Sequence, residues 1–306
     1  MTPSPVTVLV LATWVLSAGP APLRAQERSF QILAFGETSG EMVPMRCADD
    51  PGDRSTYAHL AARLGSARAE APTLTLLSGG LLGDDPFSRH LATRGAWSAS
   101  RLDELMSLAE VDAAVPGGGE FALPGGHSVP LLTHLAGGSV PYGALNLVCP
   151  ASGAPLCSAL RDQGLRIRVI GGVRVAVLSL VGPATIQFAD PRNTDHEAIL
   201  DPVKVATTAA ARLRATGEAD LVVALVNLDR EAESPAATVA FARSVEGVDL
   251  VVAGLGRNQG GRTGIDVIRF DGGRRYLVGV SPGVDPITRI RVRCRPGEDA
   301  CRVIAL

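Results

Sequence analysis

The sequence has a single lysine, few aromatic residues and no excess of positive charge. Lys204 is the only lysine, so nearly all cationic charge comes from arginine. Aromatic residues make up 4% of the chain and apolar residues 46%, which predicts a large core built from Val, Leu, Ala and Ile. The formal net charge of −2 argues against nucleic acid or an acidic membrane surface as a partner.

Long apolar runs are also absent, apart from one near the N-terminus. Residues 6–16 are apolar and are followed by small residues that offer cleavage sites after Ala18 or Ala25. A membrane-spanning helix needs roughly 20 apolar residues, so this run is too short. We expect residues 1–25 to be an export signal and residues 26–306 to form one periplasmic or extracellular domain without a transmembrane segment. No cation precedes the run, and a retained anchor is the alternative.

The five cysteines agree with export. Cys149 and Cys157 flank a loop-like segment, and Cys294 and Cys301 flank a turn-like one. Each pair is expected to close a short loop as a disulfide. Cys47 is left over as a free thiol, and no Cys-x-x-Cys spacing indicates structural zinc.

Apolar periodicity predicts an α/β fold with two stacked sheets. Strands are expected at residues 31–35, 73–77, 112–115, 142–148, 166–170, 174–181, 219–226, 249–253, 265–270, 275–280 and 287–294. Helices are expected at residues 57–67, 101–109, 129–135, 202–216 and 235–244. Gly171-Gly172 predicts a hairpin turn, and Asp201 before Pro202 predicts a capped helix start. Residues 122–128 and 182–200 are predicted to be loops within the domain.

Five short motifs occur in a fixed order. They lie at residues 32–40 (ILAFGETSG), 77–80 (LSGG), 116–121 (PGGGEF), 226–227 (VN) and 254–257 (GLGR). In this order they resemble the N-terminal catalytic domain of bacterial periplasmic 5′-nucleotidases, in the calcineurin-like metallophosphoesterase superfamily. The resemblance runs from Gln31 to Val292. It implies a metallophosphoesterase-like sandwich of two mixed β-sheets flanked by helices, with two divalent cations bound at the strand ends.

The residues that this resemblance would make metal ligands are all replaced. The family has Asp-x-His, Gly-Asp, Gly-Asn-His-Glu, a single His and Gly-His-x-His. The replaced positions here are Glu37, Ser39, Gly80, Gly118, Gly119, Asn227, Leu255 and Arg257, while Glu120 keeps the glutamate of the third motif. Gly80 stands in place of the bridging carboxylate, which normally screens the repulsion between two cations about 4 Å apart.

We therefore expect no two-metal phosphatase activity and no cofactor. The cleft lined by Gly36, Gly80 and residues 117–119 is predicted to be shallow and rich in backbone amides, with Arg257 adding one positive charge. A non-catalytic protein that binds a small anion or a partner protein, and no nucleic acid, is the function that follows.

Two alternatives remain. In the first, the protein is an active metal-dependent phosphoesterase whose metal ligands come from other positions. The candidate ligands are Glu37, Asp84, Asn227 and Asp229, with Glu120 near them. In the second, Cys47 serves a thiol redox function. Residues 41–47 are similar to a Glu-x-x-Pro-Cys-Gly-Cys element of exported relatives, but Met45 replaces its first cysteine. A thiol beside Arg46 could have a lowered pKa.

Overall fold

A computed structural model describes residues 27–36, 38, 57–83, 88, 90, 106–123, 126–138, 141–151, 153–186, 193–228, 236–254, 267–280, 283–295 and 301–305. The expected export signal at residues 1–25 lies outside these ranges. Within them, no helix has the length and apolar character needed to cross a membrane.

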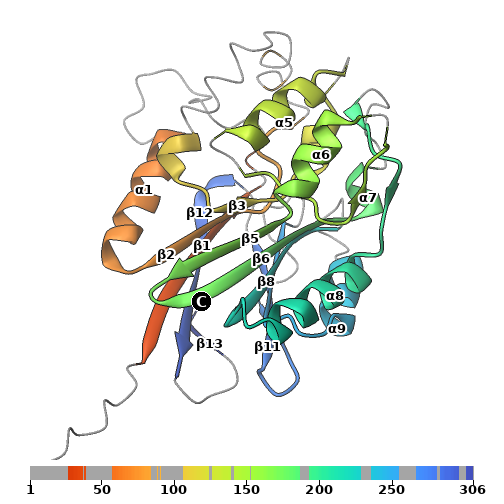
Figure 1. The fold of residues 1–306 in the computed structure, drawn as a ribbon. Coiled ribbons are helices and arrows are strands. Elements are labelled where there is room, and N and C mark those ends of the chain that lie inside the picture. Colours follow the sequence, from red (N-terminus) through yellow and green to blue (C-terminus); the bar gives the residue numbers. More distant parts are fainter. Residues whose placement is uncertain are drawn as a thin grey trace, which may run out of the picture.

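Two large sheets form the centre of the molecule, as predicted (Figure 1). The first sheet has the spatial order β13 (Arg302–Ala305), β12 (Gly283–Cys294), β1 (Arg28–Gly36), β2 (Thr73–Leu77) and β3 (Ala113–Ala114). The second has the order β10 (Val267–Phe270), β11 (Arg275–Val280), β9 (Leu250–Gly254), β8 (Leu221–Asn227), β6 (Val173–Val181) and β5 (Leu165–Ile170). Both are mixed, because each combines parallel and antiparallel pairs.

Helices flank the two sheets (Figure 1). The longer helices are α1 (Tyr57–Glu70), α5 (Ser128–Gly137), α6 (Pro155–Asp162), α8 (Pro202–Ala215) and α9 (Ala236–Ser244). The short elements are α4 (Gly118–Phe121), α7 (Pro183–Ile186), β4 (Leu147–Val148) and β7 (Ala198–Ile199). α1 lies beside the first sheet, and α8 and α9 lie together beside the second (Figure 1).

The central strands of the second sheet, β6, β8 and β9, are buried on both faces, which explains their nearly continuous apolar sequence. In β6, Val175 and Val177 belong to the main core together with residues of the first sheet, whereas Ala176 and Leu178 pack in a second cluster with α8 and α9. The alternation of side chains along a strand places these two pairs on opposite faces. A strand buried between two layers therefore has few polar residues on either side.

Local signals predicted several elements correctly. Gly171 and Gly172 have positive φ values of 56° and 79° in the turn that joins the antiparallel strands β5 and β6. The Asp201 carboxylate accepts a hydrogen bond from the Val203 amide at the start of α8 (2.9 Å).

The predicted strand at residues 142–148 is wrong. Tyr142 forms only an isolated bridge with Ala114, and β4 is two residues long. The Asn146 side chain explains the break, because it donates to the Val181 carbonyl (2.8 Å) and accepts from the Val181 amide (3.1 Å). A side-chain amide thus takes the place of a strand ladder at the end of β6.

Helix α6 was not predicted, because its first residues read as a loop. The Asp195 carboxylate caps it by accepting hydrogen bonds from the amides of Leu156 (3.0 Å) and Cys157 (2.9 Å). The cap lies 38 residues further along the chain, where no local pattern reveals it. Both expected disulfides are present, Cys149–Cys157 and Cys294–Cys301, with Cα–Cα distances of 5.5 and 4.2 Å.

Removal of the Cys149–Cys157 bridge in Cys149→Ala/Cys157→Ala should lower the free energy of unfolding by about 2 kcal/mol, the entropy expected for so short a loop. The Cys294–Cys301 bridge closes a loop of similar length, so Cys294→Ala/Cys301→Ala should lose a similar amount. Urea denaturation of the oxidised proteins measures both. An unchanged midpoint in either variant would contradict a stabilising role for that bridge.

Candidate functional site

The resemblance motifs meet at one edge of the sandwich, where the parallel strands end. β1, β2 and β3 run parallel to one another, as do β8 and β9, so the carboxyl ends within each set face the same way. The two sheets touch at this edge, because the Asn227 side-chain amide donates to the Ser78 carbonyl across a distance of 3.2 Å. The structure therefore brings together the described parts of the segments that the family resemblance implied would share one site.

Glu120 is the most highly connected side chain at this edge. It is fully buried, and its carboxylate accepts five hydrogen bonds at distances between 2.6 and 3.4 Å. The donors are the backbone amides of Gly80, Leu81, Leu82 and Gly117 and the hydroxyl of Tyr142. Glu120 thus ties the loop after β2 to the loop after β3.

The environment of Glu120 shifts its protonation equilibrium. Burial raises the pKa of this carboxyl from its ordinary value of 4.5 to about 7, and the backbone amides that donate to it act in the opposite direction. All five of these partners are donors, which is the arrangement that an ionised carboxylate requires. Both oxygens are therefore already engaged and offer little to a cation.

Three further residues complete the polar network, Thr38 within the first motif and Tyr142 and Thr185 outside the motifs, and no sequence signal pointed to their roles. Thr38 donates through its hydroxyl to the carbonyls of Gly80 (3.3 Å) and Leu81 (3.1 Å). The Thr185 hydroxyl donates to the backbone carbonyl of Asn227 (2.5 Å) and lies 3.3 Å from its side-chain oxygen. Tyr142, as noted, donates to Glu120. All three are buried.

The glycines at this edge are packed so closely that most have no room for a side chain. A Cβ on Gly119 would approach the Leu82 carbonyl oxygen, and one on Gly254 would approach the Ser78 carbonyl oxygen, both closer than the 3.0 Å that Cβ atoms keep. A Cβ on Gly118 would lie 3.2 Å from the Thr185 carbonyl. Gly80 has a φ of 65°, which L residues seldom adopt.

The described residues at this edge do not fit a pair of divalent cations. Such a centre needs carboxylate and imidazole ligands, and Gly80, Gly118 and Gly119 carry no side chain. Glu120 is occupied by amides, and the Asn227 NH₂ group points to a carbonyl. In the part of the chain that the structure describes, no three His, Cys, Asp or Glu residues gather as a metal-binding group.

Several predicted site residues lie outside the described ranges. They are Glu37, Ser39, Asp84, Asp229, Leu255, Arg257 and the cysteine Cys47. Of the acids proposed to converge here, only Glu120 is described. Of the residues predicted to line a cleft rich in backbone amides, Gly80 and Gly117 have amides that donate to Glu120.

This architecture is the calcineurin-like metallophosphoesterase fold. The NAD nucleotidase of Haemophilus influenzae superposes with a TM-score of 0.67 at 15% identity, covering 92% of this chain and 50% of that one. The 5′-nucleotidase precursor of Thermus thermophilus gives 0.66 at 21% identity, with 90% and 53% covered. The calcineurin-like phosphoesterase YfkN of Bacillus subtilis gives 0.66 at 16% identity, with 91% and 89% covered.

The chain spans about half the length of the two nucleotidases it resembles. No protein-family model matches the sequence, and no curated protein matches it either. At such low identities the likeness establishes the fold and leaves the activity to be argued from the residues.

The variant Gly119→Ala should lose about 1–3 kcal/mol of folding free energy, because its Cβ would overlap the Leu82 carbonyl. Gly118→Ala should lose less, since its nearest neighbour is 3.2 Å away. Gly65→Ala is the matched control: it lies in α1 with nothing within 4 Å, and helix propensity should make it more stable by about 0.5–1 kcal/mol. Equal stability of all three variants in urea denaturation would contradict the close packing.

Titration of Glu120 should make stability depend on pH. A pKa raised by folding means that the native state binds the proton more tightly than the unfolded state does. The stabilisation that this proton gives to the native state is therefore complete below about pH 4.5 and is lost as pH rises through about 7. The loss amounts to about 3 kcal/mol at most. Glu120→Gln removes this titration while sharing every other group with the wild type.

The measurement is urea denaturation of both proteins between pH 4 and 8. The free energy of unfolding of wild type minus that of Glu120→Gln should decrease as pH rises. A difference that is constant with pH would show that Glu120 does not titrate in this range.

Proposed function

We propose that this chain is an exported protein that keeps the metallophosphoesterase fold without two-metal catalysis and acts by binding a partner. One observation carries the proposal: three of the eight motif positions that would supply ligands are glycines, namely Gly80, Gly118 and Gly119, and the Leu82 carbonyl packs directly against Gly119. A mere loss of ligands would leave an open pocket that a neighbouring acid could refill. Here the Leu82 carbonyl lies where a side chain at position 119 would begin.

The polar groups at the edge support the same view. The amides that would bind a small anion donate instead to Glu120, a group that is itself anionic when ionised. An anion placed beside it would meet repulsion and few free donors. A partner protein is therefore favoured over a small anion.

Two disulfides and the apolar N-terminal run support export. Disulfides persist in oxidising compartments such as the periplasm and the extracellular space. A periplasmic or extracellular location is part of the proposal.

Elemental analysis of the purified mature protein, with turnover of p-nitrophenyl phosphate in added Mn²⁺, tests the catalytic part. We expect metal far below one equivalent per chain and no turnover. Gly80→Asp/Gly119→His restores two ligand types, yet should lose stability and gain no activity. The reason is that position 119 has no room for a side chain and position 80 has a positive φ.

Near-stoichiometric metal with turnover that Glu37→Ala abolishes would overturn the proposal in favour of a phosphoesterase with displaced ligands. If the protein binds no metal and its biological effect is lost in Cys47→Ser, the thiol redox function is favoured instead.

A further inference from the structure

Four arginines form a row along one face of β12. Ile290 and Val292 point into the core, so the alternation of a strand sends Arg289, Arg291 and Arg293 to the opposite, outer face. Arg295 follows at the same spacing just beyond the strand. We call Arg289, Arg291, Arg293 and Arg295 the arginine row. The Cα atoms of the row repeat about every 7 Å, over roughly 20 Å.

The strands on either side extend this surface. Arg293 pairs with Arg302 of β13 and with Ser29 of β1, and directly paired residues share a face of the sheet. Arg302 therefore adds a fifth cation beside the row. In a chain whose net charge is −2, this is a local concentration of positive charge.

Within the described ranges, two carboxylates engage three of the four arginines of the row. Glu70 pairs with Arg289 at 2.7 Å, and Glu27 lies 2.5 Å from Arg293 and 3.9 Å from Arg295. Arg291 is exposed, and its guanidinium has no hydrogen bond or ion pair with any described residue. A guanidinium without a partner is a ready donor for two parallel hydrogen bonds to a carboxylate.

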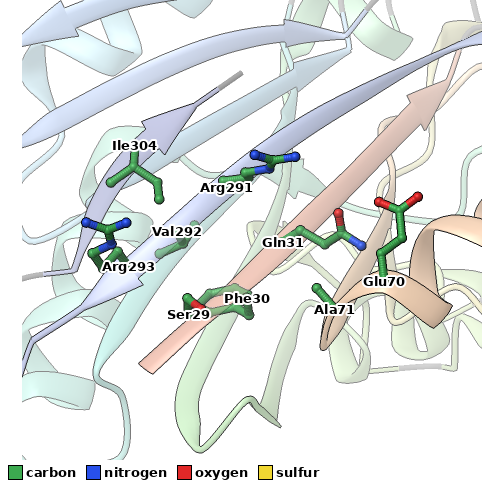
Figure 2. A pocket seen from close by; sticks show the side chains of 9 residues that line it. All are labelled: Ser29, Phe30, Gln31, Glu70, Ala71, Arg291, Val292, Arg293 and Ile304. Carbon is green, nitrogen blue, oxygen red and sulfur yellow. The ribbon is translucent and has the colours of Figure 1, made fainter. Parts of the chain in front are cut away.

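An open groove of about 340 Å³ lies at this position (Figure 2). Arg291 and Arg293 of β12 border it together with Gln31 of β1, and Glu70 stands at its end on α1 (Figure 2). Ile304, 44% exposed, supplies apolar surface to its lining, whereas the side chains of Phe30 and Val292 are buried in the core. The groove is thus mainly a charged strip with one exposed apolar side chain.

We propose that the arginine row binds an extended acidic peptide segment of a partner protein, with carboxylates on alternate residues. An extended chain repeats its side chains every second residue at about 7 Å, the same period as the row. The exposed side chain of Ile304 can pack against the aliphatic part of one side chain of such a segment. Single-stranded nucleic acid binds by stacking on exposed aromatic rings, and the one aromatic lining residue, Phe30, is only 2% exposed.

This inference names a partner for the binding role proposed above, but it uses a different surface. Metal content and turnover report on the strand-end edge, whereas peptide binding reports on the outer face of the first sheet. Either proposal can therefore fail while the other stands.

The test is fluorescence anisotropy with a labelled seven-residue peptide that alternates Glu and Thr, starting and ending with Glu. The wild type should bind it, and Arg291→Ala should weaken binding about tenfold, the loss expected for one charge-assisted pair. Arg293→Ala should also weaken it. Arg212→Ala is the matched control: it removes an exposed arginine of α8, which flanks the other sheet, and should bind like the wild type.

A peptide of the same composition with its four glutamates adjacent should bind more weakly, because its charges do not match the period of the row. Equal binding of the two peptides, equal losses in Arg291→Ala and Arg212→Ala, or tighter binding of oligo-dT or of vesicles containing phosphatidylserine would each overturn the proposal. Arg291 has no partner among the described residues, so Arg291→Ala should keep the wild-type circular dichroism and unfolding midpoint.

Discussion

The carboxylate of Glu120 is the interaction on which the strand-end edge depends. It is buried without an opposing cation among the described residues, and the backbone amides of two loops stabilise it in place of water. A buried carboxylate with fewer donors would cost several kcal/mol, so the loops must keep the positions that aim their amides at it. This requirement fixes the chain direction at Gly80 and Gly117. The close contacts of Gly119 and Gly254 then follow from how near the loops must come.

Hydrogen bonds connect the two sheets at this edge. Asn227, at the end of β8, reaches the Ser78 carbonyl in the first sheet, and Thr185 holds the Asn227 backbone. Thr38 donates to the loop after β2 from the end of β1. Each contact is between neutral groups and contributes about 1 kcal/mol, so the edge is held by several weak contacts that act together.

Much of the fold could be predicted from sequence because its signals are local. The glycine pair at 171–172 and the Asp201 cap act within a few residues of themselves, and the buried strands are continuous apolar runs. The failures have non-local causes: Asn146 replaces a strand ladder by binding β6, and Asp195 caps a helix 38 residues away. At the site, the sequence shows glycine at expected ligand positions, but it does not show that the Leu82 carbonyl packs against Gly119. Nor could any pattern assign Thr38, Tyr142 or Thr185, whose hydroxyls matter only through residues distant in sequence.

The arginine row shows the same division between pattern and structure. Alternate arginines at 289–295 are plain in the sequence, yet only the pairing of β12 with β1 and β13 shows that they share an outer face. This outer face differs from the strand-end edge, where the backbone amides of Gly80 and Gly117 already donate to Glu120. Recognition of a partner by hydrogen bonds needs donors that are not already engaged. Arg291 has such donors among the described residues, on a regular sheet whose rigidity fixes the spacing of its neighbours. The regular backbone of β12 can thus present an ordered row of charges on the side of the fold, independently of the strand-end edge.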